Sequence, residues 1–151
     1  MIVYRVCHAK FSDQLASSGR ANRWNQRSQE VIYTSSTISL CALELLAHTS
    51  GIRPSGIFKV LHIKIADTTE VQTIHQDQLP SDWSSLKAYS TTQRLGSKWY
   101  ENMNSLVLSV PSAIIPQESN YIINTRHESF SKNVHLIETT DFIWDHRFPE
   151  L

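Results

Sequence analysis

Residues 31–48 read VIYTSSTISLCALELLAH. The first four of them, Val31 to Thr34, are β-branched, apolar or aromatic and predict a strand. Ser35, Ser36 and Thr37 then follow in a row, and all three are residue types that cap helix N-termini. The apolar residues after them predict a helix from about Ile38 to Thr49, which Gly51 ends. A strand therefore leads directly into a helix near the N-terminal third of the chain.

Shorter patterns on either side complete the prediction. Runs of β-branched or apolar residues indicate further strands at 1–6, 58–65, 106–110, 121–123 and 134–138. A second helix is expected over 91–100, weakened by Gly96, with a single helical turn over 128–132 and a turn over 79–83. About six short strands with two or three helices predict an α+β fold, in one compact domain over residues 1–151.

Composition excludes several classes of protein. The chain has 151 residues, with 14 Lys and Arg against 14 Asp and Glu, so its formal net charge is zero. Broad electrostatic binding to nucleic acid or to an anionic membrane needs a basic excess that is absent here. No apolar run approaches a membrane span, and the first residues do not form a signal peptide. We therefore expect a soluble cytoplasmic domain that neither spans a membrane nor binds nucleic acid directly.

The first candidate site residue is Glu44, the only charge on the predicted helix over residues 38–49. This helix is apolar nearly all round, so we expect most of its faces to be buried. A buried carboxylate is costly unless it is paired or hydrogen-bonded. Two interpretations follow: a structural ion pair or exposed helix edge, or a carboxylate at the floor of a functional site.

A second candidate is the polar segment from Phe11 to Gln29, which is long for a loop inside a compact domain. It contains three arginines, Arg20, Arg23 and Arg27, and the aromatic Trp24, which we expect to anchor the loop. Arginines in this setting suit a bidentate grip on phosphate or carboxylate, and the alternative is a solvated basic loop.

Other reactive residue types give weaker signals. Ser112 follows Pro111 at a strand end and is either a turn serine or a hydroxyl that contacts a ligand. The seven histidines and the two cysteines, Cys7 and Cys41, show no metal-ligand spacing, so we expect no metal. The cysteines read as small core residues rather than nucleophiles.

Several of these runs, taken together and in order, resemble the RES domains, the toxins of RES–Xre toxin–antitoxin modules. The resemblance covers nearly the whole chain and rests on GRANRWN at 19–25, VIYTSS at 31–36, LCALELLAH at 40–48, LPSDW at 79–83, TQRLGSKW at 92–99, VPSAIIP at 110–116 and Asn120-Tyr121. Two departures concern the arginine-rich loop. Ala21-Asn22 stands where the family has paired glycines, and Ser28 stands where it has a later glycine. Asn22 tolerates the left-handed conformation.

The resemblance implies a fold similar to the ADP-ribosyltransferases and an enzyme that destroys NAD⁺. It places the polar site residues at Arg23, Tyr33, Glu44 and Ser112, with Asn120 as a weaker match. It further implies an Xre-like antitoxin as partner in a hetero-oligomer. NAD⁺ would be the substrate, and no cofactor is implied. Glu44 and Arg23 would be catalytic, and Arg23, Tyr33, Ser112 and Asn120 would bind the substrate.

The chemistry is compatible with one carboxylate. Nicotinamide leaves as a neutral ring from a cationic one, so no general acid is needed, and one carboxylate can stabilise the cationic ribose. The acceptor, whether water, phosphate or a protein side chain, stays open. The alternatives are ADP-ribosyl transfer to a protein and a non-catalytic partner-binding module in which Glu44 and Arg23 form an ion pair. An RNA-cleaving toxin is disfavoured by the zero net charge.

Overall fold

The computed structural model describes residues 1–150 and is built around a seven-stranded sheet in the order β4-β5-β6-β2-β1-β3-β7. Its strands are β1 (Ile2–His8), β2 (Val31–Ser35), β3 (Phe58–Ile65), β4 (Val71–Thr73), β5 (Val107–Pro111), β6 (Ser119–Asn124) and β7 (Val134–Phe142). The helices are α1 (Ile38–His48), α2 (Tyr89–Asn102) and α3 (Phe130–Asn133), with 3₁₀ turns η1 (Ala9–Phe11) and η2 (Gln76–Gln78). Neighbouring strands are antiparallel except β4 and β5, which are parallel. No helix in the described part is long and apolar enough to cross a membrane.

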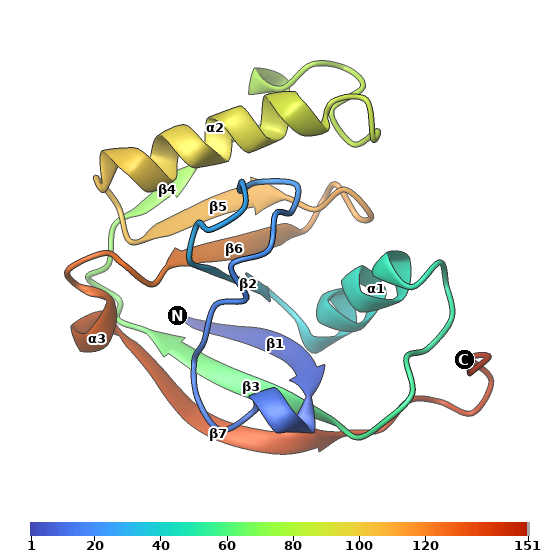
Figure 1. The fold of residues 1–151 in the computed structure, drawn as a ribbon. Coiled ribbons are helices and arrows are strands. Elements are labelled where there is room, and N and C mark those ends of the chain that lie inside the picture. The colour runs from blue at the N-terminus through green and yellow to red at the C-terminus, as the bar shows by residue number, and fades with distance from the viewer. Residues whose placement is uncertain (151) are drawn as a thin grey trace.

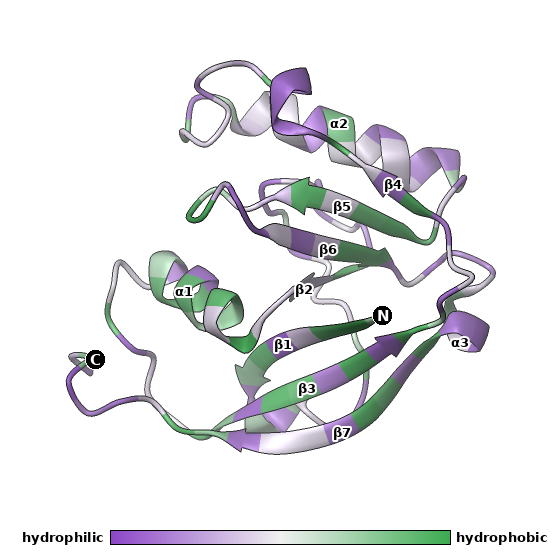
Figure 2. Ribbon diagram, turned by 180° about the vertical axis from the view of Figure 1, so that it is seen from behind, coloured by the Kyte–Doolittle hydropathy of each residue, from purple (hydrophilic) through white to green (hydrophobic). Residues whose placement is uncertain are grey.

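The strands are arranged in two halves, with α2 alongside β4, β5 and β6 and with β1, β3 and β7 on the other side of β2 (Figure 1). The main core contains buried residues from both halves, among them Val3, Ile63, Val107 and Ile123. A second core beneath α2 includes Trp99 of that helix. The strands that carry these cores are largely hydrophobic, whereas much of α2 is hydrophilic (Figure 2).

The predicted α+β architecture is confirmed, with one strand more than expected. β3 spans residues 58–65, as predicted, since its apolar residues form a clear strand pattern in the sequence. The strand that the sequence did not predict is β4, whose three residues are all exposed and show no hydrophobic pattern. It exists through its parallel pairing with β5, a long-range contact that the local sequence does not encode.

The expectation that helix α1 is buried on most faces is wrong. Only Leu40, Cys41 and Leu46 of this helix are buried, and Leu43 is 39% exposed. One side of the helix packs near Phe58 and Trp144, while the other side is uncovered by the described chain. The apolar composition of this helix therefore did not indicate which of its faces is buried.

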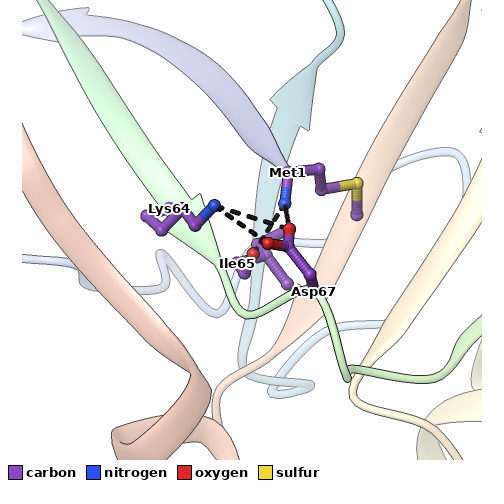
Figure 3. Close-up of polar contacts among 4 residues, drawn as sticks. All are labelled: Met1, Lys64, Ile65 and Asp67. Carbon is purple, nitrogen blue, oxygen red and sulfur yellow. Dashed lines mark hydrogen bonds and ion pairs between the residues drawn. The ribbon is translucent and has the colours of Figure 1, made fainter.

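A small polar cluster joins the beginning of β1 to the end of β3 (Figure 3). The N-terminal ammonium of Met1 donates to the Ile65 carbonyl at 2.8 Å and pairs with the Asp67 carboxylate. Lys64 lies 3.4 Å from the same carboxylate. Hydrogen bonds from the ammonium and from Lys64 lower the pKa of Asp67. Since Asp67 is exposed, we assign the cluster little stabilising energy.

Candidate functional site

Three of the predicted site residues meet at one carboxylate oxygen. The Ser112 hydroxyl donates to Oε1 of Glu44 at 2.8 Å, and the Asn120 amide nitrogen Nδ2 donates to the same oxygen at 2.5 Å. Ser112 is fully buried, whereas Glu44 and Asn120 are partly buried. The sequence therefore identified three side chains that the fold brings into direct contact.

The β5–β6 hairpin and α1 position this cluster, and both lie at the same end of the sheet in Figures 1 and 2. Ser112 follows the last residue of β5, and its hydroxyl oxygen accepts hydrogen bonds from the backbone N–H groups of Ile114 and Ile115, both at 3.1 Å. Thr37 caps α1 by accepting from the Leu40 N–H at 3.1 Å. The ordered hairpin turn and the capped helix thus fix both sides of the contact.

The two donors leave Glu44 with one oxygen occupied and one open. Both Ser112 and Asn120 contact Oε1, and no hydrogen bond from a residue within 1–150 reaches Oε2. The two hydrogen bonds to Oε1 hold the carboxylate in one orientation. Glu44 also makes no ion pair with Arg23 or with any other described residue. The structural ion pair considered for this glutamate is therefore wrong, and Oε2 is available to a ligand.

Arg23 is bound to the backbone of the segment before α2. Its Nη1 donates to the carbonyls of Trp83 at 2.9 Å and Ser85 at 3.2 Å, and its Nη2 donates to the Ser84 carbonyl at 2.9 Å. The guanidinium also lies over the Tyr89 ring, 4.9 Å from its centre. Arg23 thus joins the arginine-rich loop to the segment over residues 83–89.

The other two arginines of the loop, Arg20 and Arg27, are exposed, and their side chains make no hydrogen bond within the described chain. The basic loop thus divides into one organised arginine and two solvated ones. The solvated-loop interpretation therefore holds for Arg20 and Arg27, whereas Arg23 binds backbone carbonyls, and its grip on phosphate or carboxylate stays a prediction.

Tyr33 ties the arginine-rich loop to β2. Its hydroxyl donates to Oδ1 of Asn25 at 2.8 Å and accepts from the Trp24 N–H at 3.0 Å. Burial raises the pKa of Tyr33 well above its usual range, and the nearby Glu44 charge raises it further while Arg23 lowers it. Tyr33 therefore stays protonated and lies within electrostatic reach of both charged site residues.

The loop is further held by polar residues that the sequence gave no reason to select. The Gln93 amide of α2 donates to the carbonyls of Asn22 at 3.0 Å and Asn25 at 3.2 Å. Ser97, one turn later, donates to the side chain of Gln29 at 3.0 Å. Polar side chains on a helix usually indicate a solvent face, so no sequence signal marked these contacts.

Trp24 and Gly96 explain how closely the loop sits on α2. Trp24 is 3% exposed, so its predicted role as an anchor is confirmed. A Cβ atom at Gly96 would lie 1.8 Å from the Trp24 carbonyl oxygen. Glycine is thus required at position 96 by the close approach of the loop backbone, although it weakens the helix.

The two departures from the family pattern have different outcomes. Ser28 adopts a left-handed φ of 70°, the conformation that favours the glycine expected at this position. Asn22 does not have a positive φ, so the tolerance considered for it is not used. Gly19 does, with φ of 62°, and its carbonyl accepts from the Ser28 N–H at 2.9 Å. The loop therefore closes without the missing glycines.

The remaining candidates for chemistry do not hydrogen-bond to the Glu44 carboxylate. Cys7 and Cys41 are buried, and burial raises the pKa of both thiols. Among residues 1–150, no three His, Cys, Asp or Glu side chains are grouped as a metal site would require. Two cavities of about 200 and 140 Å³ are lined by other residues, mainly around Thr69 and His127 in the first and around His75 and Ser109 in the second. The hydrogen-bonded cluster around Glu44, rather than either cavity, is the candidate site.

Comparison with known proteins gives a consistent result. The RES domain family model matches residues 2–145. A protein named Toxin Res from Photorhabdus laumondii is 32% identical over 151 residues, covering 97% of this chain and 96% of that protein. A Toxin Res from Yersinia enterocolitica is 31% identical, covering 97% of this chain and 99% of that protein. A protein named Prs ADP-ribosylating toxin from Sphingobium sp. is 29% identical, covering 90% of this chain and 87% of that protein.

A solved structure shares the fold. It is a chain of the Mycobacterium tuberculosis MbcT–MbcA toxin–antitoxin complex, with a TM-score of 0.74, 17% identity, and coverage of 93% of this chain and 83% of that one. At this identity the likeness concerns the fold alone. The family model spans nearly the whole chain, and two curated relatives exceed 30% identity over nearly their full lengths. This chain therefore belongs to the RES domain family of toxins.

Proposed function

We propose that this protein is the toxin of a toxin–antitoxin module and that it depletes NAD⁺ by cleaving the bond between nicotinamide and ribose. One observation carries the proposal: Glu44 is held through Oε1 by Ser112 and Asn120, while Oε2 has no partner among the described residues. A carboxylate oriented in this way suits stabilisation of a positive charge that develops at a fixed point.

The reaction needs this arrangement because its transition state is cationic at the ribose. As the glycosidic bond breaks, its electron pair goes to nicotinamide, which leaves as a neutral ring, and the ribose carbon becomes oxocarbenium-like. Oε2 of Glu44 would accept a hydrogen bond from a ribose hydroxyl and stabilise that charge, while Oε1 keeps its hydrogen bonds from Ser112 and Asn120. No second carboxylate is needed, since the leaving group requires no proton.

Arg23 and Tyr33 supply the rest of the proposed substrate site. Arg23 would bind the pyrophosphate, exchanging the neutral carbonyls of residues 83–85 for charged oxygens, which form stronger hydrogen bonds with a guanidinium. Tyr33 would position the nicotinamide half, with its hydroxyl kept protonated. Ser112, whose hydroxyl is buried and fully hydrogen-bonded, would serve the substrate by orienting Glu44, whereas the partly buried Asn120 would also contact the nicotinamide amide or a ribose hydroxyl.

A second candidate function uses the same site. One relative bears the name Prs ADP-ribosylating toxin, which favours transfer of ADP-ribose to a protein in place of hydrolysis or phosphorolysis. The Glu44 carboxylate would stabilise the same cationic ribose in either case. The two functions differ only in the acceptor, so a single assay can separate them.

The proposed partner is an Xre-like antitoxin that silences this activity in the cytoplasm, where NAD⁺ is present. Support comes from the solved neighbour of the same fold, which is a toxin in complex with an antitoxin. The proposal predicts that the chain inhibits growth when produced alone and is harmless when its antitoxin is produced with it.

The test follows both halves of NAD⁺ in one incubation. The purified chain is mixed with NAD⁺ labelled in the adenylate, and nicotinamide release and protein-bound label are measured with and without a bacterial extract. Release without bound label supports NAD⁺ cleavage, and label on a protein supports the transferase. Absence of both would favour a non-catalytic partner-binding protein, in which Glu44 and Arg23 do not form the ion pair first considered. The Glu44→Gln variant is the matched control, because it removes the charge and keeps the side-chain volume.

A further inference from the structure

Ser35 is a buried hydroxyl that no site prediction included. It is the last residue of β2, is 4% exposed, and lies opposite Asn120 in the pairing of β2 with β6. Its Oγ donates to Oδ1 of Asn120 at 2.6 Å. Because cross-strand partners present side chains on the same face, the strand register itself creates this contact.

The direction of the hydrogen bond is fixed by the carboxylate beyond it. An ionised carboxylate only accepts hydrogen bonds, so the Asn120 group 2.5 Å from Glu44 must be its NH₂ and not its carbonyl oxygen. The carbonyl oxygen of that amide then faces Ser35, whose hydroxyl must donate. Ser35, Asn120 and Glu44 therefore form one directional chain of hydrogen bonds.

We propose that Ser35 is a positioning residue, which locks the Asn120 amide and thereby orients the Glu44 carboxylate toward the ribose. The inference rests on the function proposed above. It extends the site from five residues to six and gives β2, the strand that carries Tyr33, a second role in it.

The hydrogen-bond chain depends on Ser35 because the terminal side-chain torsion of asparagine has a broad, roughly two-fold energy profile, so the torsion alone does not fix the amide. Asn120 is only partly buried, so without the Ser35 donor its amide can rotate away from Glu44 toward water. Glu44 would then keep only the Ser112 hydrogen bond on Oε1. Loss of this second donor lets the carboxylate rotate, which lowers the fraction of molecules whose Oε2 is placed for reaction.

The residue that precedes Ser35 in the sequence, Thr34, provides a matched control. Thr34 is 2% exposed, and its hydroxyl donates to the Tyr121 carbonyl at 2.7 Å, so it is a buried hydroxyl of the same strand whose bond does not lead to Glu44. Thr34→Val removes that hydroxyl and keeps the shape. Thr34→Val thus removes the hydrogen bond to the Tyr121 carbonyl, and Ser35→Ala removes the bond to Asn120 together with a contact to the Cys41 thiol. Only Ser35→Ala disturbs the hydrogen bonds that lead to Glu44.

The experiment measures kcat and KM for NAD⁺ together with the melting temperature. We expect Ser35→Ala to lower kcat about tenfold with KM changed less than about twofold, the size of effect set by one hydrogen bond. Thr34→Val should lower the melting temperature without lowering kcat. The double variant Ser35→Ala with Asn120→Ala should have the kcat of Asn120→Ala alone, because Ser35 acts only through that amide. An unchanged kcat in Ser35→Ala, or an effect that multiplies with Asn120→Ala, overturns the proposal.

A second measurement separates this inference from the proposed function. If the wild-type protein releases no nicotinamide, the proposed function fails. The hydrogen-bond chain from Ser35 to Glu44 is then tested by the melting temperatures of Ser35→Ala, Glu44→Ala and their double variant. We expect the double variant to melt at least about 2 °C higher than the sum of the single shifts predicts, because the chain is broken only once. Shifts that add within about 1 °C show that Ser35 and Glu44 are independent and overturn the positioning role.

Discussion

Ser112 donates its hydroxyl hydrogen to Glu44 at 2.8 Å across 68 residues of sequence, and the same hydroxyl oxygen accepts two backbone N–H groups of the β5–β6 hairpin. The serine thus links the turn that follows β5 to the carboxylate of α1. The local sequence around Ser112 does not indicate a contact with Glu44, nor does the sequence around Glu44 indicate one with Ser112. Only the fold brings the two residues together.

Ser112→Ala tests both roles of this hydroxyl. The hydroxyl orients Glu44, and it is also the acceptor of two backbone N–H groups, which lose their partner in the variant. We therefore expect a loss of about 1–3 kcal/mol in the free energy of unfolding as well as a loss of activity. Ser109→Ala is the control, because Ser109 is a buried serine of β5 whose side chain makes no hydrogen bond within the described chain. A covalent adduct on Ser112 during turnover would instead make it a nucleophile and contradict the positioning role.

Arg23→Lys tests whether the guanidinium fork is needed. Lysine keeps the charge but cannot span the three carbonyls of residues 83–85. We expect a rise in KM for NAD⁺ of roughly tenfold or more, because the proposed bidentate contact with the pyrophosphate would be lost. We also expect faster proteolysis near Leu86, which is 84% exposed. The exposed Arg20→Lys is the control in the same loop, and equal effects of the two variants would show that only charge matters.

Tyr33→Phe tests the link between the loop and β2, and it gives a pH dependence. Because the pKa of the Tyr33 hydroxyl is raised in the folded protein, its neutral form is stabilised up to the usual tyrosine pKa, and this stability is lost as the pH rises beyond it. The wild type should therefore lose its advantage over Tyr33→Phe above about pH 10. At neutral pH the variant should melt lower, since Asn25 and the Trp24 N–H lose their partner. Melting curves of both proteins from pH 7 to pH 11 measure this, and a constant difference would contradict it.

Gly96→Ala tests the close approach of the loop to α2. In an isolated helix this change is stabilising, but here the new methyl group would overlap the Trp24 carbonyl. We expect a loss of about 1–3 kcal/mol, the usual cost of overpacking, and a rise in KM because Arg23 adjoins Trp24. Lys98→Ala, at an exposed position of the same helix, should change neither quantity. Stability gained in Gly96→Ala would mean that the loop moves away without cost.

These contacts show what the sequence could and could not predict. The bounds of β3 and α1 followed from hydrophobic runs and caps, which are local signals. Glu44 was found because it is the only charge on an apolar helix. The acceptors of Arg23 could not be found, since they are backbone carbonyls 60 to 62 residues away, and any residue type carries a carbonyl. Ser35 was hidden for another reason: three capping residues stand in a row, and only the structure shows that Thr37 caps the helix and leaves Ser35 for Asn120.

Glu44→Gln separates the catalytic role of the carboxylate from any structural one. Glutamine keeps the volume, and its oxygen can still accept from Ser112 and Asn120, but it removes the negative charge. If that charge stabilises a cationic ribose in the transition state, turnover should fall by roughly 10²–10⁴-fold. Binding of NAD⁺ should change far less, because the positive charge develops only as the bond breaks.

The stability of the same variant completes the argument. Glu44 has no ion-pair partner among the described residues, so no buried cation is left unpaired when it is neutralised. The melting temperature should therefore stay the same or rise. Glu118→Gln is the matched control, since Glu118 is a partly buried carboxylate that accepts from the α1 cap Thr37 at 3.3 Å. It should keep turnover within a few-fold of wild type. A Glu44→Gln protein that melts early yet turns over at the wild-type rate per folded molecule would end the catalytic assignment, because the charge would then serve the fold and not the reaction.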